Sequence, residues 1–132
     1  MKNILMLFMA LALTSTTVIA QASEEIMKQR ASEMHSLIKV DDADKHKEFI
    51  LKNYSKKLLE KYEMERHTGM FKMINKDFRD SKIVSMKPNV KENKLLMLIE
   101  RISDKHQVTF DISYDPKDNY KINGMGIEAG EM

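Results

Sequence analysis

Residues 107–114 read Gln-Val-Thr-Phe-Asp-Ile-Ser-Tyr, with an apolar side chain at every second position. Because successive side chains of a strand point to opposite faces, this stretch predicts a strand with one buried and one solvated face. Three more segments have the character of strands, namely residues 83–86, 94–102 and 120–127. The short links between them contain proline, asparagine, aspartate and serine, which favour tight turns. The second half of the chain therefore predicts a four-stranded antiparallel sheet.

A helical period of apolar residues marks the chain before this sheet. A first helix should begin at the capping residue Ser23 and bury one face, which consists of Ile26, Ala31, Met34, Leu37 and Ile38. A second helix is predicted over residues 44–54, and a third, capped by Ser55, over residues 56–78 with an interruption near Gly69. Since the helices come first and the strands follow, the predicted fold class is α+β, with three N-terminal helices packed on a four-stranded antiparallel curved sheet.

The first 22 residues carry the pattern of a cleavable export signal. Lys2 supplies a positive charge, residues 4–13 form an unbroken apolar run, and Ala20-Gln21-Ala22 offers the small residues that signal peptidase accepts. The apolar run is shorter than the roughly 20 residues that a membrane span needs. We therefore expect a signal peptide over residues 1–22, a single domain over residues 23–132, an extracytoplasmic location (periplasmic or secreted), and no membrane span after cleavage.

Composition removes several function classes. The 132 residues include 22 Lys plus Arg and 20 Asp plus Glu, so the chain lacks the concentrated positive charge of nucleic-acid-binding proteins. It contains no cysteine, which excludes thiol nucleophiles, disulfides and iron–sulfur clusters. We expect no nucleic-acid partner and no cofactor.

Two groups of potential metal ligands have simpler explanations. Met64, His67, Met70 and Met73 are soft ligands that suit Cu(I), but a three-residue step spreads them around half of a helix. The acidic segment 41–46 lacks the glycine and the distal glutamate of a calcium loop, and its aspartates suit a helix cap. No metal site is predicted.

The sequence favours a binding or accessory role over catalysis. Ser36-Leu37-Ile38-Lys39 matches the S-x-x-K motif of penicillin-recognising enzymes, but that serine must open a core helix, whereas Ser36 should lie near the end of one. Glu100 is the one carboxylate with apolar neighbours. The alternative function is therefore a small-molecule enzyme of the isomerase or dehydratase type that uses Glu100, although an ion pair at a strand end explains this residue more simply. No catalytic residue is assigned.

Three stretches carry a family resemblance: residues 49–55 (Phe-Ile-Leu-Lys-Asn-Tyr-Ser), the helix that reaches Phe71, and residues 120–127 (Tyr-Lys-Ile-Asn-Gly-Met-Gly-Ile). Through them, residues 37–129 resemble the small N-terminal accessory domain of secreted serine hydrolases in the β-lactamase-related and tail-specific peptidase groups. The order of elements is similar to that of cystatin-like and nuclear-transport-factor-two-like folds. In such hydrolases the catalytic serine lies in a downstream domain. The resemblance thus implies a non-catalytic module that assists a serine hydrolase.

The predicted strand at residues 94–102 is apolar on both faces. Leu95, Met97 and Ile99 form one face, and Leu96, Leu98 and Ile102 form the other, which is the candidate interaction face. One layer of helices can cover only one of them, so the second face needs the first helix, an apolar ligand or another subunit. By resemblance to cone-shaped folds that dimerise through the sheet, we expect a homodimer ahead of a protein partner such as a serine hydrolase.

Gly124 and Gly126 are predicted to be structural residues. They lie two positions apart on one face of the last strand, where a missing side chain permits a bulge or the close approach of another element. Valine at both positions should then destabilise the fold.

Overall fold

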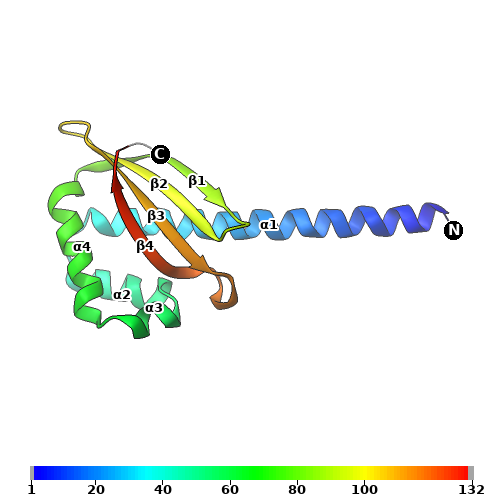
Figure 1. The fold of residues 1–132 in the computed structure, drawn as a ribbon, viewed down its shortest axis with the longest axis horizontal. Helices are drawn as coiled ribbons and strands as arrows, with labels where there is room; N and C mark the ends of the chain where they lie inside the picture. The colour runs from blue at the N-terminus through cyan, green and yellow to red at the C-terminus, as the bar shows by residue number, and fades with distance from the viewer. Residues whose placement is uncertain (1, 131–132) are drawn as a thin grey trace.

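The computed structural model describes the backbone of residues 2–130 and the side chains of residues 19–130. Helices precede strands along the described chain (Figure 1), in the order α1 (Lys2–Ile38), α2 (Ala43–Asn53), α3 (Lys56–Lys61), α4 (Met64–Phe78), β1 (Ser81–Asn89), β2 (Lys94–Arg101), β3 (Gln107–Asp115) and β4 (Lys121–Ala129). A 3-10 turn at Pro116–Asp118 connects β3 to β4. The α+β class and the four predicted strands are confirmed.

The strands form one antiparallel sheet in the order β1-β2-β3-β4. Met97 on β2 lies opposite Phe110 on β3, and neither side chain has exposed surface. Leu95 and Ile99, two residues to either side of Met97, are equally buried. Since side chains opposite each other in a ladder share a face, the alternation in the sequence becomes continuous apolar rows on the inner face of the sheet.

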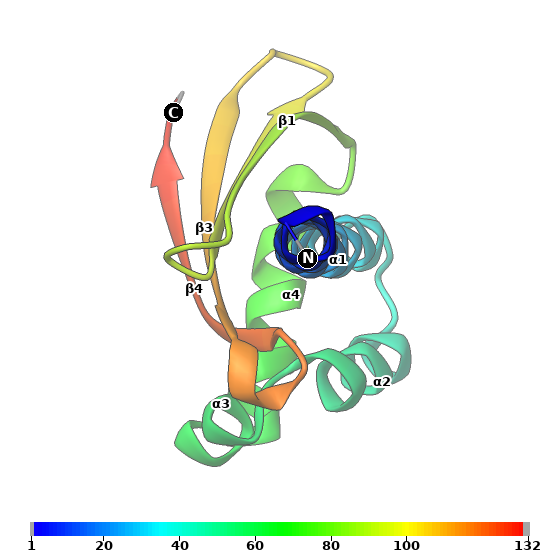
Figure 2. The same cartoon turned by 90° about the vertical axis from the view of Figure 1, so that its right-hand side faces the viewer.

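Helices cover only this inner face. Figure 2 shows α1, α2 and α4 on one side of the sheet, with α1 and α4 nearest to it. Met27 and Met34 on α1 are fully buried, and the Tyr114 hydroxyl of β3 donates to the Met27 carbonyl oxygen at 2.8 Å. The idea that the first helix folds across the outer face is therefore wrong. The predicted buried face of α1 also needs one correction, because Ile26 is exposed and Met27 takes its place in the core.

The helical half contains one more helix than predicted. Tyr62 and Glu63 have extended backbone angles and separate α3 from α4, whereas α4 continues through Gly69 without a break. Asp42 and Ser55 act as the N-caps of α2 and α3, as the sequence indicated.

Ser23, the predicted first residue after cleavage, lies inside α1 and does not cap a helix here. Its hydroxyl donates to the Ile19 carbonyl oxygen at 2.9 Å, one turn earlier. Cleavage after Ala22 would make Ser23 the first residue of a shortened α1. Within the residues that the structure describes, no helix combines the length and the apolar character needed to cross a membrane.

Candidate functional site

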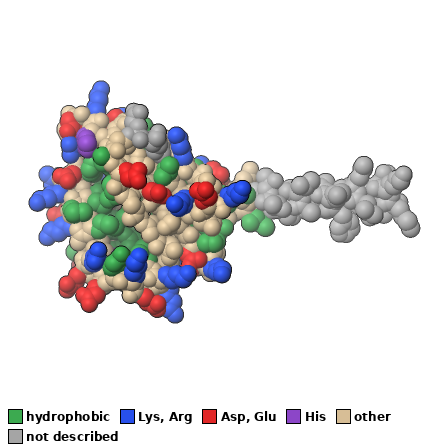
Figure 3. All heavy atoms as spheres, in the orientation of Figure 1, with side chains coloured by type: hydrophobic (Ala, Val, Ile, Leu, Met, Phe, Trp, Pro, Cys, Tyr) green, Lys and Arg blue, Asp and Glu red, His purple; other side chains and the backbone are tan. Residues whose placement is uncertain are grey.

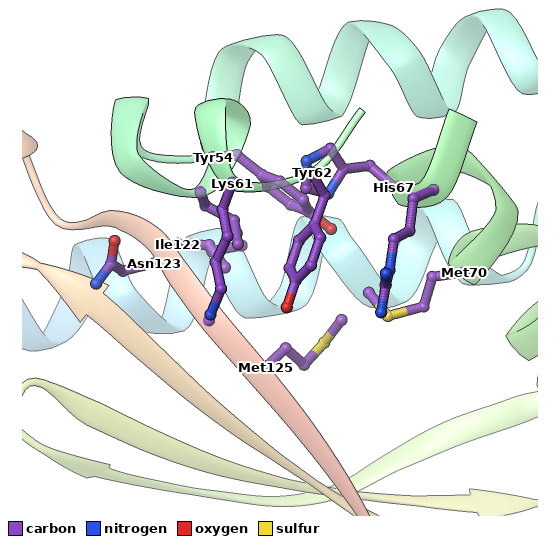
Figure 4. Close-up of a pocket in the computed structure, with 11 residues that line it drawn as sticks. Tyr54, Lys61, Tyr62, His67, Met70, Ile122, Asn123 and Met125 are labelled. Atoms are coloured by element: carbon purple, nitrogen blue, oxygen red, sulfur yellow. The ribbon is translucent and has the colours of Figure 1, made fainter. Parts of the chain in front are cut away.

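A cavity of about 280 Å³ lies where the end of α2, α3, the start of α4 and the start of β4 meet (Figure 4). It is lined by Tyr54, Leu58, Lys61, Tyr62, Arg66, His67, Met70, Ile122, Asn123, Gly124 and Met125. We call it the Tyr54–His67 cavity. Its size is close to the lower limit of typical small-molecule sites, roughly 300 Å³. None of its lining residues is acidic, and two carry a positive charge.

Ser55, which follows Tyr54, links the end of α2 to β4 through hydrogen bonds. Its backbone N–H donates to the Ile122 carbonyl oxygen at 2.8 Å, and its hydroxyl donates to Asn123 Oδ1 at 2.7 Å. The same hydroxyl oxygen accepts a hydrogen bond from the Leu58 N–H at 3.1 Å, which caps α3. Because Ser55 is fully buried, these bonds hold the neighbouring Tyr54 beside the first residues of β4.

The break between α3 and α4 turns Tyr62 toward the cavity. Tyr62 ends α3 with φ −134° and ψ 151°, so its ring leaves the path of the helix. Figure 4 shows Lys61 and Tyr62 extending side by side toward β4, with Met125 beyond the Tyr62 ring. His67, on the first turn of α4, meets Tyr62 edge to face with 6.0 Å between ring centroids. The extended residues thus bring aromatic groups from two helices to one space.

Two buried polar atoms in the cavity have no hydrogen-bond partner within the described part of the chain. They are Tyr54 Oη and His67 Nε2, in residues that are 1% and 4% exposed. A buried donor or acceptor without a partner costs about 1–3 kcal/mol, and native structures contain few of them. The two rings are nearly perpendicular and their centroids lie 5.2 Å apart. Two side chains with unpaired buried polar atoms thus lie in contact at this cavity.

Burial sets the protonation of both side chains. Desolvation raises the pKa of Tyr54 well above its usual value, so the hydroxyl keeps its proton and can donate. Desolvation also lowers the pKa of His67, although the backbone carbonyls of Tyr62 and Leu58 act in the opposite direction. At pH 7 the cavity thus contains a protonated phenol and a neutral imidazole.

The rim of the cavity is cationic. The Arg66 guanidinium lies 4.3 Å from the centroid of the Tyr62 ring, and Lys61 Nζ lies 5.3 Å from the same centroid. Neither cation has a carboxylate within 4 Å among the described residues. A cavity with exposed cations at its rim and polar hydrogen-bonding atoms in its depth is suited to a small anionic group.

Glu100 lies outside this cavity, on the outer face of the sheet. Its Oε1 accepts a hydrogen bond from Gln107 Nε2 at 3.1 Å, and its Oε2 lies 3.4 Å from Lys82 Nζ. Both partners lie on the neighbouring strands. The carboxylate is therefore paired as the sequence suggested, in an ion pair and a hydrogen bond near the end of β2.

The candidate interaction face is divided between the sheet and a turn. Leu96 and Leu98 lie on the outer face of β2, whereas Ile102 follows β2 in the turn. Leu98 is only 7% exposed, because Ser85 and Thr109 lie beside it on the adjacent strands. Ile102 is 53% exposed and supplies most of the accessible apolar surface.

The two predicted structural glycines have different surroundings. Gly124 lies opposite Ser113, and a Cβ atom added to Gly124 would stand 2.8 Å from Ser113 Oγ. Gly126 lies opposite Asp111, and an added Cβ would meet nothing within 4 Å. Close approach therefore occurs at Gly124 alone, and it comes from a serine side chain of β3, beside a register shift in the ladder.

The residues considered as metal ligands serve packing and capping. His46 stacks on Phe71 with 4.9 Å between ring centroids, and its Nε2 lies within hydrogen-bonding distance of the Leu37 and Val40 carbonyl oxygens at the end of α1. His67 and Met70 line the cavity, while Met73 is exposed on α4. Across the described residues, no three His, Asp or Glu side chains gather in a way that could hold a metal ion.

No motif in the sequence marks Tyr54, Lys61, Tyr62 or Arg66 as site residues, and His67 stands out there only as a potential metal ligand. A signal was present, because Lys61-Tyr62 and Arg66-His67 place two cations beside two rings within seven residues. Comparisons of the chain with protein-family models, curated proteins and solved structures found no match.

Proposed function

We propose that this protein is an exported, non-catalytic binding module whose Tyr54–His67 cavity binds a carboxylate group. The observation that carries this proposal is the buried, protonated Tyr54 hydroxyl, which lacks a partner in a cavity lined by the cations Lys61 and Arg66 and by no acidic residue. Keeping this hydroxyl unpaired weakens the folded state, and a ligand that accepts its hydrogen bond offsets that loss.

A carboxylate fits the cavity better than a neutral or cationic group does. Its oxygens accept a hydrogen bond from the Tyr54 hydroxyl, which keeps its proton. Lys61 and Arg66 supply a positive field that favours an anion over an uncharged group of the same shape. The lining residues include no aspartate or glutamate, so no anionic side chain repels a carboxylate there.

Calorimetric titration with N-acetylglycine, a minimal carboxylate, tests this function, with the uncharged N-acetylglycinamide as the matched ligand. The acid should bind, and the amide should bind at least about tenfold more weakly. Tyr54→Phe keeps the ring and removes the hydroxyl, so it should weaken binding of the acid. The control Tyr120→Phe removes a hydroxyl outside the cavity and should leave the affinity unchanged.

Tyr54→Phe should also change the melting temperature of the ligand-free protein. Because it removes a buried hydroxyl without a partner, it should raise the melting temperature while it weakens binding. A lower melting temperature together with unchanged affinity would show that the hydroxyl serves the fold and would contradict the proposed site.

Export through the leader at residues 1–22 is part of the same proposal. Mass spectrometry of the extracytoplasmic fraction should find a chain that begins at Ser23, and an intact chain with Met1 in the membrane fraction would contradict it. A serine hydrolase is the proposed partner, on the strength of the family resemblance. A neighbouring hydrolase gene that lacks this module would support the accessory role. Self-association through Leu96, Leu98 and Ile102 is proposed as well.

A further inference from the structure

The outer edge of β4 is open beyond its first residues. In the described chain, the one backbone hydrogen bond that reaches this edge from outside the sheet is from the Ser55 N–H to the Ile122 carbonyl oxygen, at 2.8 Å. Past this point, residues 123–129 read Asn-Gly-Met-Gly-Ile-Glu-Ala, without a lysine, arginine or proline. An edge of this kind is a template on which another strand can pair.

The opposite edge of the sheet is protected. β1 carries Lys82 and Lys87, a proline at residue 88, and a register shift between Ile83 and Ser85. Edge lysines, prolines and bulges are the devices by which proteins block strand addition. The chain thus protects one edge of its sheet and leaves the other available.

The ladder determines which groups face the open edge. Gly130 N–H donates to the Gln107 carbonyl oxygen at 3.0 Å. Because bonded and non-bonded pairs alternate in an antiparallel ladder, Glu128 and Gly126 also direct their backbone groups toward β3. Met125, Ile127 and Ala129 therefore direct their N–H and C=O groups outward. Ile127 lies opposite the fully buried Phe110, so its side chain faces the helices.

An apolar hollow of about 190 Å³, which we call the groove, lies beside this edge between β4 and α4. It is lined by Met73, Ile74, Asp77, Phe78, Val108, Phe110 and Ile127. Farther along α4, Met70 and Met125 line the Tyr54–His67 cavity, and packed core side chains fill the space between the groove and that cavity. Figure 3 shows apolar side chains gathered over α4 and β4, with Lys and Arg side chains around them.

The positions of the positive charges determine which way a peptide would lie along β4. Lys61 and Arg66 stand at the end where β4 begins, beside the cavity for which a carboxylate is proposed. A peptide whose terminal carboxylate occupied that cavity would run toward it from Ala129, which is antiparallel to β4. At about 3.3 Å per residue, four to six peptide residues would cover the open edge.

We infer that β4 binds the extended C-terminal segment of a partner protein by strand addition. The segment pairs antiparallel with the outward N–H and C=O groups of Met125, Ile127 and Ala129, and its terminal carboxylate lies in the Tyr54–His67 cavity. Side chains at alternate positions of the segment are apolar and enter the groove beside Met73 and Ile127. Backbone pairing supplies affinity in this mode of recognition, and pockets for alternate side chains supply specificity. The inference rests on the proposed carboxylate site.

The probes are six-residue peptides that alternate serine with valine or with leucine and end in a free carboxylate, together with their C-terminal amides. At least one acid should bind the full chain about tenfold more tightly than N-acetylglycine, and its amide should bind about tenfold more weakly. Ile127→Lys places a charge in the groove and should weaken the peptide about tenfold without changing the affinity for N-acetylglycine. Val84→Lys adds the same charge at an exposed position on β1, the opposite edge strand of the sheet, and should leave both affinities unchanged.

Amide hydrogen exchange tests the backbone pairing directly. Bound peptide should slow exchange of the Met125, Ile127 and Ala129 N–H groups, while those of Gly126 and Glu128, already paired with β3, should change little. Binding of N-acetylglycine without binding of any peptide acid would overturn strand addition and keep the carboxylate site. Failure of N-acetylglycine and of the peptides would overturn both. A dimer that dissociates in Ile127→Lys would identify a second copy of the chain as the occupant and would also overturn the inference.

Discussion

The side-chain amide of Asn75 on α4 donates a hydrogen bond to the backbone carbonyl oxygen of Ile38, the last residue of α1, at 2.8 Å. The carbonyl groups in the last turn of a helix have no partner within the helix, so a buried helix end needs one from elsewhere. Asn75 is buried and supplies it from an element 37 residues farther along the chain. This bond fixes the end of α1 against the middle of the helical layer.

Asn75→Ala should destabilise the protein, because it leaves the Ile38 carbonyl buried without a partner. We expect a loss of about 1–3 kcal/mol in the free energy of unfolding, which corresponds to roughly 4–12 °C in the melting temperature of a domain of this size. Lys72→Ala, at an exposed position on the same helix, is the control and should change the melting temperature by less than about 2 °C. Equal melting temperatures for the two variants would show that the bond contributes nothing.

Stability should depend on pH through His35. Its Nε2 lies 3.0 Å from Ser81 Oγ. Because the Ser81 hydroxyl donates its own proton to the Phe78 carbonyl oxygen, Ser81 Oγ accepts a hydrogen bond from the His35 Nε2–H group. Burial, with a smaller effect from the Lys39 charge, lowers the pKa of His35 below its usual value. The unfolded chain therefore binds a proton more readily, and the stability present above about pH 6.5 decreases as the pH falls below it.

The measurement is the melting temperature between about pH 7.5 and 5.5, in the protein and in His35→Gln. Glutamine keeps a side-chain donor but does not titrate, so the decrease toward low pH should be smaller in the variant. It should not vanish, because burial lowers the pKa of His67 in the same direction. An identical pH profile in His35→Gln would show that His35 does not cause the loss of stability at low pH.

The glycines of β4 should respond differently to valine. Gly124→Val places Cβ against Ser113 Oγ and should lower the melting temperature, whereas Gly126→Val faces open space and should leave it within about 2 °C. Ser113→Ala removes the contacting oxygen, so the Gly124→Val variant should regain stability in that background. Thermal melts of the two single variants and of the Gly124→Val, Ser113→Ala pair, read as a double-mutant cycle, measure this coupling. Additive effects would mean that the strain has another origin.

The sheet was predictable because its pattern is local. Alternation at residues 107–114 assigns Phe110 and Ile112 to the core without knowledge of the partner strand, and turn residues mark where each strand ends. The break at Tyr62 carries no such signal, since neither glycine nor proline stands there, whereas Gly69 suggests a break and lies in an intact helix. The position of that break depends on tertiary packing, in which Tyr62 meets His67 and Arg66.

The cavity could not be predicted because its members converge from four elements, the end of α2, α3, the start of α4 and the start of β4. Tyr54 looks like an ordinary core residue in the sequence, and His67 looks like part of a methionine-rich helix face. The distinguishing property is that their polar atoms lack partners, and this exists only after Ser55 has joined the end of α2 to β4. Propensity and periodicity describe the neighbours of a residue along the chain, whereas an unpaired atom is a property of the folded chain.

The outer face of the sheet offers the last prediction, which is self-association. No helix of the described chain covers this face, as Figure 2 shows, and Leu96 exposes apolar surface on it beside the polar Lys82 and Glu100. Ile102, in the turn that follows β2, is 53% exposed. A stable dimer buries about 1,200–2,000 Å² in total. A charged side chain buried in that contact without a partner destabilises the dimer strongly, so one such substitution should dissociate it. Light scattering should find a dimer for the protein and a folded monomer for Ile102→Glu. Leu51→Glu on α2 is the matched control, since Leu51 and Ile102 are each 53% exposed, and it should remain a dimer. A protein that is already monomeric, or equal dissociation of the two variants, would exclude the outer face as the interface.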